Sequence, residues 1–91
     1  MIRDFAGKRT RMVFAGESPK GFPSSILKIA RRKLKMVDAA VALTDLRAPP
    51  GNQLEALTGD RKGQIRINDQ WRICFVWTPE GPTGVEVVDY H

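Results

Sequence analysis

The sequence is poor in the side chains that most often carry out chemistry. It contains one cysteine, one histidine and one tyrosine, which are Cys74, His91 and Tyr90. A single cysteine excludes an internal disulfide and any metal site built on several thiolates. One cysteine and one histidine so far apart in the sequence also lack the spacing of metal ligands. We therefore expect neither a metal nor another cofactor.

Long apolar stretches are missing as well. No stretch approaches the ~18–20 consecutive apolar residues that a membrane helix needs. Charged residues stand at positions 3 and 4, where a signal peptide would soon need an apolar run. These two absences predict a cytoplasmic protein with no membrane partner.

What the sequence does contain is typical of a small folded protein. Its 91 residues are 42% hydrophobic and 27% charged, which is the balance of an ordinary globular chain. A chain of this length builds only one core, so a Rossmann domain and a large barrel are excluded. We expect a single domain over residues 1–91.

The positive charge is concentrated in the first half of the chain. The formal net charge is +5. Residues 1–47 hold eleven Lys and Arg against four Asp and Glu, a net charge of +7, whereas residues 48–91 carry a net charge of −2. A basic half favours a polyanionic partner such as a nucleic acid. The alternative is that the charge serves only solubility.

The strongest periodicity predicts a helix that begins at Ser24 or Ser25, after a shorter helix within residues 7–15. Apolar residues recur there at intervals of three and four, which places them on one helical face: Leu27, Ala30, Leu34, Val37 and Val41. Lys33 falls inside a widened version of this face, so we expect its ammonium group to reach out to water along its stem.

The opposite side of the same helix is basic. Four cations of one sign gather there, with no acid before Asp38: Lys28, Arg31, Arg32 and Lys35. A cluster of this kind is either a solvated face or a surface for a phosphate backbone or an acidic partner.

Alternating apolar residues predict strands in the second half of the chain. We expect them at 53–57, 64–68, 71–77 and 85–89, with a turn region over 79–84 and a further short strand at 2–5. A three-residue connection over 68–70 pairs Ile67 with Trp71 and keeps the apolar side chains of both strands on one side. The same register sets Arg66 opposite Arg72 on the other side, where the two either splay into water or flank an anion such as a phosphate.

The remaining groups favour acid–base chemistry. Glu55, Tyr90 and His91 can exchange protons, and Arg66 and Arg72 can stabilise negative charge. Such a set suits metal-free cleavage of RNA, in which a base takes the 2′-OH proton and an acid protonates the leaving 5′-oxygen. The alternatives are that Glu55 is a surface carboxylate and His91 a frayed terminus. For Cys74 we expect a packing role.

Three segments carry a family likeness: PPGNQLEALTGDRKGQ at 49–64, IRINDQWRICF at 65–75 and DYH at 89–91. With them, the chain resembles the HigB group of toxins, the plasmid-maintenance killer family of the RelE/ParE superfamily. This resemblance implies an α/β (α+β) fold of the RelE type. Two N-terminal helices would pack on a mixed, mostly antiparallel sheet of four or five strands.

The resemblance also implies a function. It points to the toxin of a type II toxin–antitoxin system, an endoribonuclease that enters the ribosomal A site and cuts mRNA. Its partners would be the ribosome, mRNA and a HigA-like helix-turn-helix antitoxin, with which the toxin forms a hetero-oligomer.

Site residues follow from the resemblance position by position. Tyr90 and His91 match the terminal pair of HigB-like toxins, with Asp89 beside them, and Arg72 matches an arginine expected to hold the scissile phosphate. Glu55 stands where several HigB toxins have histidine and resembles a glutamate of the related YoeB toxin, so it is a candidate base. The expected RNA or phosphate ligands are Arg61, Lys62 and Arg66, together with Lys28, Arg31, Arg32 and Lys35.

Two departures from the family pattern keep other functions open. Thr58 stands where many relatives carry lysine, and the segment between Gly63 and Ile65 is shorter than in relatives by two residues. These departures favour a toxin with weakened activity, or a binding module of the same fold. A ParE-like inhibitor of DNA gyrase is a third possibility.

Overall fold

The computed structural model describes residues 1–57 and 62–89. Among the expected site residues, Arg61, Tyr90 and His91 lie outside this part, as does Thr58. The helices are α1 (Lys8–Phe14) and α2 (Ser24–Ala39), followed by the short 3₁₀ helices η1 (Leu43–Arg47) and η2 (Pro50–Asn52). The strands are β1 (Glu55–Leu57), β2 (Lys62–Arg66), β3 (Trp71–Thr78) and β4 (Gly81–Asp89).

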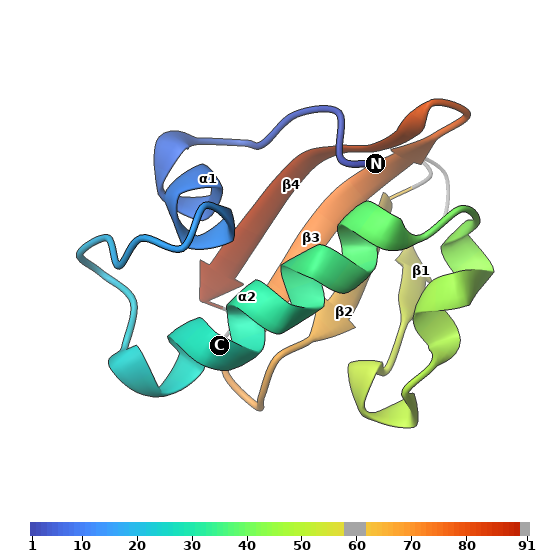
Figure 1. The fold of residues 1–91 in the computed structure, drawn as a ribbon. Coiled ribbons are helices and arrows are strands. Elements are labelled where there is room, and N and C mark those ends of the chain that lie inside the picture. The colour runs from blue at the N-terminus through green and yellow to red at the C-terminus, as the bar shows by residue number, and fades with distance from the viewer. Residues whose placement is uncertain (58–61, 90–91) are drawn as a thin grey trace.

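The four strands form one sheet in the order β1-β2-β3-β4, and all neighbours are antiparallel. The helices lie on one side of this sheet, with α2 crossing in front of it (Figure 1). This confirms the α+β architecture with two N-terminal helices on a mostly antiparallel sheet. The strand expected at 2–5 reduces to a single parallel bridge between Phe5 and Val85.

The core lies between α2 and the sheet. Leu34 and Val37 of α2 are fully buried, as are Ile65 of β2, Ile73 of β3 and Val85 of β4. Burial of side chains of this size contributes roughly 1.5–3 kcal/mol each, which makes the apolar face of α2 the main link between the layers. The predicted face of Leu27, Ala30, Leu34 and Val37 is therefore confirmed.

The expectation that Val41 continues this face is wrong, because Val41 is 90% exposed. The helix ends at Ala39, and Ala40 takes an extended conformation. The backbone N–H groups of Val41 and Ala42 then donate to the Asp45 carboxylate, at 2.9 and 3.0 Å. These hydrogen bonds turn the chain into η1 and take position 41 away from the core.

The N-terminal segment covers the outer edge of β4. The backbone N–H of Arg3 donates to the carbonyl of Pro82 at 2.8 Å, and that of Ala6 donates to the carbonyl of Val85 at 3.0 Å. Further along, the hydroxyl of Thr10 accepts from the N–H of Val87 at 3.0 Å. An edge strand presents unpaired backbone groups, and this segment satisfies several of them.

The turn region expected over 79–84 is shorter than predicted, because β4 already begins at Gly81. Gly81 has a φ of 123°, and a Cβ there would lie 2.4 Å from the carbonyl oxygen of Met1. Glycine is therefore needed for the close approach of the N-terminal segment. Pro82 is tolerated in a strand because β4 lies at the edge of the sheet.

Candidate phosphate-binding site

The register of β2 and β3 is the one expected from the sequence. Ile65 pairs with Ile73, Gln64 with Cys74, and Arg66 with Arg72. Successive side chains of a strand point to opposite faces of a sheet. Since Ile65 and Ile73 face the helices, Arg66 and Arg72 project from the other side, which we call the open face.

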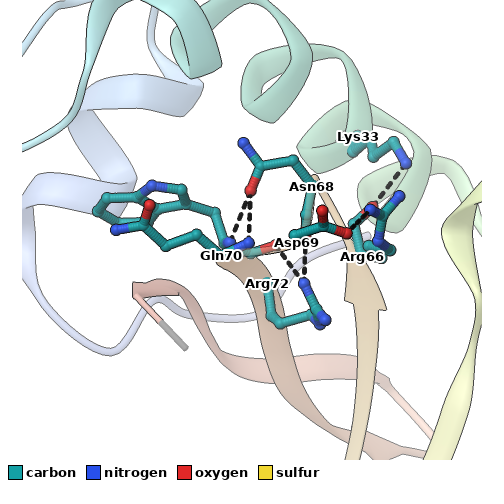
Figure 2. A network of polar contacts seen from close by, with 7 residues as sticks. Lys33, Arg66, Asn68, Asp69, Gln70 and Arg72 are labelled. Atoms are coloured by element: carbon teal, nitrogen blue, oxygen red, sulfur yellow. Dashed lines mark hydrogen bonds and ion pairs between the residues drawn. The ribbon is translucent and has the colours of Figure 1, made fainter. Parts of the chain in front are cut away.

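The β2–β3 turn is built around one side chain. The side-chain oxygen of Asn68 accepts from the backbone N–H of Gln70 at 2.9 Å and from that of Trp71 at 2.8 Å (Figure 2). The N–H of Ile67 donates to the carbonyl of Trp71 at 2.9 Å. Asparagine replaces backbone partners in such turns, and here it fixes the three-residue connection that sets Arg66 opposite Arg72.

Each of the two arginines is anchored at this turn (Figure 2). The guanidinium of Arg66 forms an ion pair with Asp69, whose side chain is 99% exposed. The guanidinium of Arg72 donates to the carbonyl of Asn68 and, at 3.1 Å, to that of Trp71. These local contacts offset the repulsion expected between like charges on paired residues.

Lys33 corrects an expectation. Its side chain was expected to reach water, but it is only 5% exposed, and its Nζ donates to the carbonyl oxygen of Arg66 at 2.6 Å. Burial lowers the pKa of Lys33, and the positive charges of Arg32 and Arg66 lower it further. Through its bond to the Arg66 carbonyl, Lys33 brings a third basic side chain to the turn, from α2 on the helix side.

Glu55 lies at the start of β1, opposite Gln64. Its carboxylate accepts a hydrogen bond from the side-chain amide of Gln64 at 2.9 Å. The pairing places Glu55 on the open face with Arg72, but two strands away and two residues further along. With ~4.8 Å between strands and ~3.4 Å per residue, their Cα atoms are about 12 Å apart. Glu55 and Arg72 thus share a face without touching.

Asp89 occupies a different position from the arginines. It pairs with Trp71, whereas Arg72 pairs with Val88. Because side chains alternate, Asp89 lies on the helix side of the sheet at its end. Its carboxylate accepts hydrogen bonds from the side-chain amide of Gln70, at 3.1 and 3.2 Å. Asp89 is therefore tied to the turn but is not on the open face.

Lys62 begins β2 on the open face, opposite Val76. It borders a shallow hollow of about 280 Å³ that is also lined by Gly63, Cys74, Phe75, Val76 and Gly84. Burial raises the pKa of the Cys74 thiol, and the nearby Glu86 raises it further. A thiol held in its protonated form is a poor nucleophile, which agrees with a packing role.

The basic residues of α2 lie on the other side of the molecule. Lys28, Arg32 and Lys35 are exposed on the surface of α2 that points away from the sheet. Arg31 instead donates to the carbonyls of Val13 at 3.0 Å and Glu17 at 3.1 Å, at the end of α1. These helix residues and the arginines of β2 and β3 thus lie on different faces, although the charges of Arg32 and Arg66 both act on Lys33.

Comparison with known proteins identifies the family. Residues 3–91 match the HigB-like toxin family, described as the RelE-like toxin of the type II toxin–antitoxin system HigB. The chain belongs to the HigB-like toxin family. It is 53% identical over 57 residues to Toxin HigB-1 of Vibrio cholerae, an alignment that covers 60% of this chain and 60% of that protein. It is also 37% identical over 62 residues to an uncharacterized protein of Haemophilus influenzae, covering 66% of this chain and 61% of the relative.

This membership confirms the resemblance seen in the sequence. The alignments span only 60% and 61% of the two relatives' lengths. Within residues 1–57 and 62–89, no helix combines the length and the apolar character needed to cross a membrane.

Three residues of the site were not predicted from the sequence to take part in it: Lys33, Asn68 and Gln70. The turn over 68–70 was predicted, and the role of the Asn68 side chain in it could also have been found, because asparagine commonly bonds to the backbone of a turn. Lys33 had a signal too, since a lysine inside an apolar helical face is either stretched to water or bonded in the interior. We expected the first outcome, and the structure shows the second.

Proposed function

We propose that this protein is the toxin of a type II toxin–antitoxin system that stops translation by cutting mRNA in the ribosomal A site. The observation that supports this best is the anchored pair of Arg66 and Arg72 on the open face, in a chain of the HigB-like family. Guanidinium groups bind phosphate oxygens with two parallel hydrogen bonds. In this proposal, residues 1–91 form one toxin domain in the cytoplasm.

The reaction needs a base, a charge stabiliser and an acid. A base removes the proton of the 2′-OH, the 2′-oxygen attacks the adjacent phosphorus, and an acid protonates the 5′-oxygen as its bond to phosphorus breaks. We assign charge stabilisation to Arg72. Glu55 and His91 are the candidates for base and acid, with Tyr90 and Asp89 as supporting groups. Neither a metal nor another cofactor is required.

The small size of the chain fits a substrate that arrives already positioned. The hollow on the open face measures about 280 Å³, so residues 1–57 and 62–89 do not enclose an RNA segment there. In the proposal the ribosome presents the mRNA, and Lys62, Arg61 and Arg66 hold its phosphates. The basic surface of α2, with Lys28, Arg31, Arg32 and Lys35, meets ribosomal RNA or an acidic partner.

A HigA-like antitoxin with a helix-turn-helix domain is the proposed regulatory partner. It would form a hetero-oligomer with the toxin and block the reaction. Co-expression with the neighbouring gene should therefore restore growth to cells that express this chain.

The test is to map mRNA 5′ ends in a translating extract, with and without the purified protein. Cleavage within codons at the A site, and only when ribosomes are translating, is the expected result. Arg72→Ala should reduce the cleavage rate by about 10²-fold, the typical loss when one stabilising donor is removed. Intact mRNA with the wild-type protein would contradict the proposal, and inhibited DNA supercoiling would point to a gyrase inhibitor instead.

A further inference from the structure

The carbonyl group of Arg66 has an unusual partner. Backbone groups of successive residues in a strand point to opposite neighbours. The N–H of Ile67 is bonded to Trp71 of β3, so the backbone groups of Arg66 point away from β3, toward the side of β1. Yet β1 begins at Glu55, opposite Gln64, two residues short of Arg66. The ammonium group of Lys33 instead donates a hydrogen bond to the Arg66 carbonyl oxygen, which a longer β1 would otherwise pair with.

Satisfying one carbonyl oxygen with a buried ammonium group has a large desolvation cost. An isolated charge in the interior loses its hydration, whereas a neutral donor such as glutamine would satisfy the same oxygen at a smaller cost. What a lysine adds is charge, and little solvent screens it because the side chain is only 5% exposed. That charge acts on the guanidinium of Arg66, whose own positive charge in turn lowers the pKa of Lys33.

The Arg66 side chain has a partner of opposite charge. Its guanidinium forms an ion pair with the exposed carboxylate of Asp69 (Figure 2). Arg66 is thus held at two points: Lys33 fixes its backbone carbonyl, and Asp69 pairs with its guanidinium.

We propose that Lys33 is a positioning residue for RNA, whose buried ammonium group fixes Arg66 so that its guanidinium meets a phosphate next to the one that is cut. This inference rests on the proposed function. Lys33 does not touch the substrate and acts only through Arg66. Arg66 contributes to binding of the ground state, so loss of Lys33 raises KM and leaves kcat nearly unchanged.

The experiment measures mRNA cleavage on programmed ribosomes under multiple turnover, with the ribosome complex in excess over the protein. Lys33→Met should raise KM about ten-fold, which corresponds to ~1.4 kcal/mol, and change kcat by less than about two-fold. Damage to folding alone would lower the active fraction, which reduces apparent kcat and leaves KM unchanged. Lys20→Met, at an exposed lysine before α2, is the matched control for loss of one charge.

A double-mutant cycle decides whether Lys33 acts through Arg66. In an Arg66→Ala background, Lys33→Met should raise KM by less than about two-fold, because the group that it positions is gone. A further ten-fold increase in the double variant would overturn the inference, as would an unchanged KM in Lys33→Met.

Lys33→Gln keeps the measurement possible where Lys33→Met does not fold. The glutamine amide retains a donor but lacks the charge, so KM should still rise by several-fold, and Lys33→Arg should recover most of the loss. If the wild-type protein itself fails to cut mRNA, the proposed function is contradicted. If the wild type cuts normally and the Lys33 variants match it, only the positioning role is contradicted.

Discussion

The protein carries two groups of cations that differ in how they are held. On the outer surface of α2, Lys28, Arg32 and Lys35 are exposed. At the β2–β3 turn, Lys33, Arg66 and Arg72 are tied to backbone carbonyls or to Asp69. Exposed charges attract a polyanion from any direction and are weakened by salt. Anchored charges lose less freedom on binding, so they define where a phosphate sits.

The largest expected effect is on ribosome binding, when the exposed charges of α2 are removed together. The triple variant Lys28→Gln, Arg32→Gln, Lys35→Gln should weaken binding to ribosomes by about 10²-fold at low salt. Its slope of log affinity against log salt should be shallower by about 2, because roughly 0.7 counterions are released per phosphate contact on a single strand. Equilibrium binding at several salt concentrations measures both quantities.

A matched variant neutralises three other exposed cations, Lys8, Lys20 and Arg47. Its salt slope should stay close to that of the wild type. Equal slopes for the two triple variants would remove the distinction between the α2 surface and the rest of the basic half.

A medium effect, on stability, is expected from a change in the β2–β3 turn that anchors Arg66 and Arg72. Asn68→Ala removes the acceptor of the Gln70 and Trp71 N–H groups, so the free energy of unfolding should fall by about 1–2 kcal/mol. Denaturant unfolding measures this change. Glu80→Ala, in the exposed turn between β3 and β4, is the control and should stay within about 0.5 kcal/mol of the wild type. Equal losses in the two variants would mean that Asn68 does not organise its turn.

A small gain in RNA affinity is expected when Arg66 is released from its ion pair with Asp69. Asp69→Asn keeps the shape of the side chain and removes the charge that competes with an RNA phosphate. Affinity for a short single-stranded RNA should rise by about two- to five-fold, in line with the weak coupling of exposed ion pairs. Glu80→Gln makes the same change of charge at the other turn and should have a smaller effect. A lower affinity of Asp69→Asn would show that Asp69 supports binding instead of competing with it.

The smallest expected effect is on the pH dependence of the free energy of unfolding. The pKa of Lys33 is lowered in the folded protein, so above that value the folded state binds fewer protons at Lys33 than the unfolded state does. The free energy of unfolding should then rise with pH between the lowered pKa and the ordinary value of about 10.4. Lys33→Met should lack this contribution, so the difference in stability between wild type and variant should change in favour of the wild type as pH increases through that range. If the difference in stability between wild type and Lys33→Met does not depend on pH, Lys33 does not have a lowered pKa in the folded protein.

Patterns that repeat along the chain allowed much of the fold to be predicted. The spacing of Leu27, Ala30, Leu34 and Val37 identified α2, and the alternation in β2 and β3 identified the register that places Arg66 opposite Arg72. Both patterns reflect burial, which recurs with the period of the helix or strand.

Features that depend on contacts between distant segments were not predictable in this way. The bond from Lys33 to Arg66 joins residues 33 positions apart, and no local pattern shows where β1 stops. The exposure of Val41 depends on Asp45, which captures the backbone after Ala39. Of the expected catalytic residues, Arg72, Glu55 and Asp89 lie in three different strands, and only the three-dimensional pairing shows how far apart they are.

The contact between the N-terminal segment and β4 has a consequence for synthesis. The backbone N–H of Gly84 donates to the carboxylate of Asp4, 80 positions earlier in the chain, and Val85 is fully buried. Contacts so distant along the chain form late, because the intervening residues must first be made. While β4 is not yet made, a nascent chain lacks the fourth strand of the sheet. The core that Val85 joins is therefore completed only after nearly all of the residues 1–89 have been synthesised.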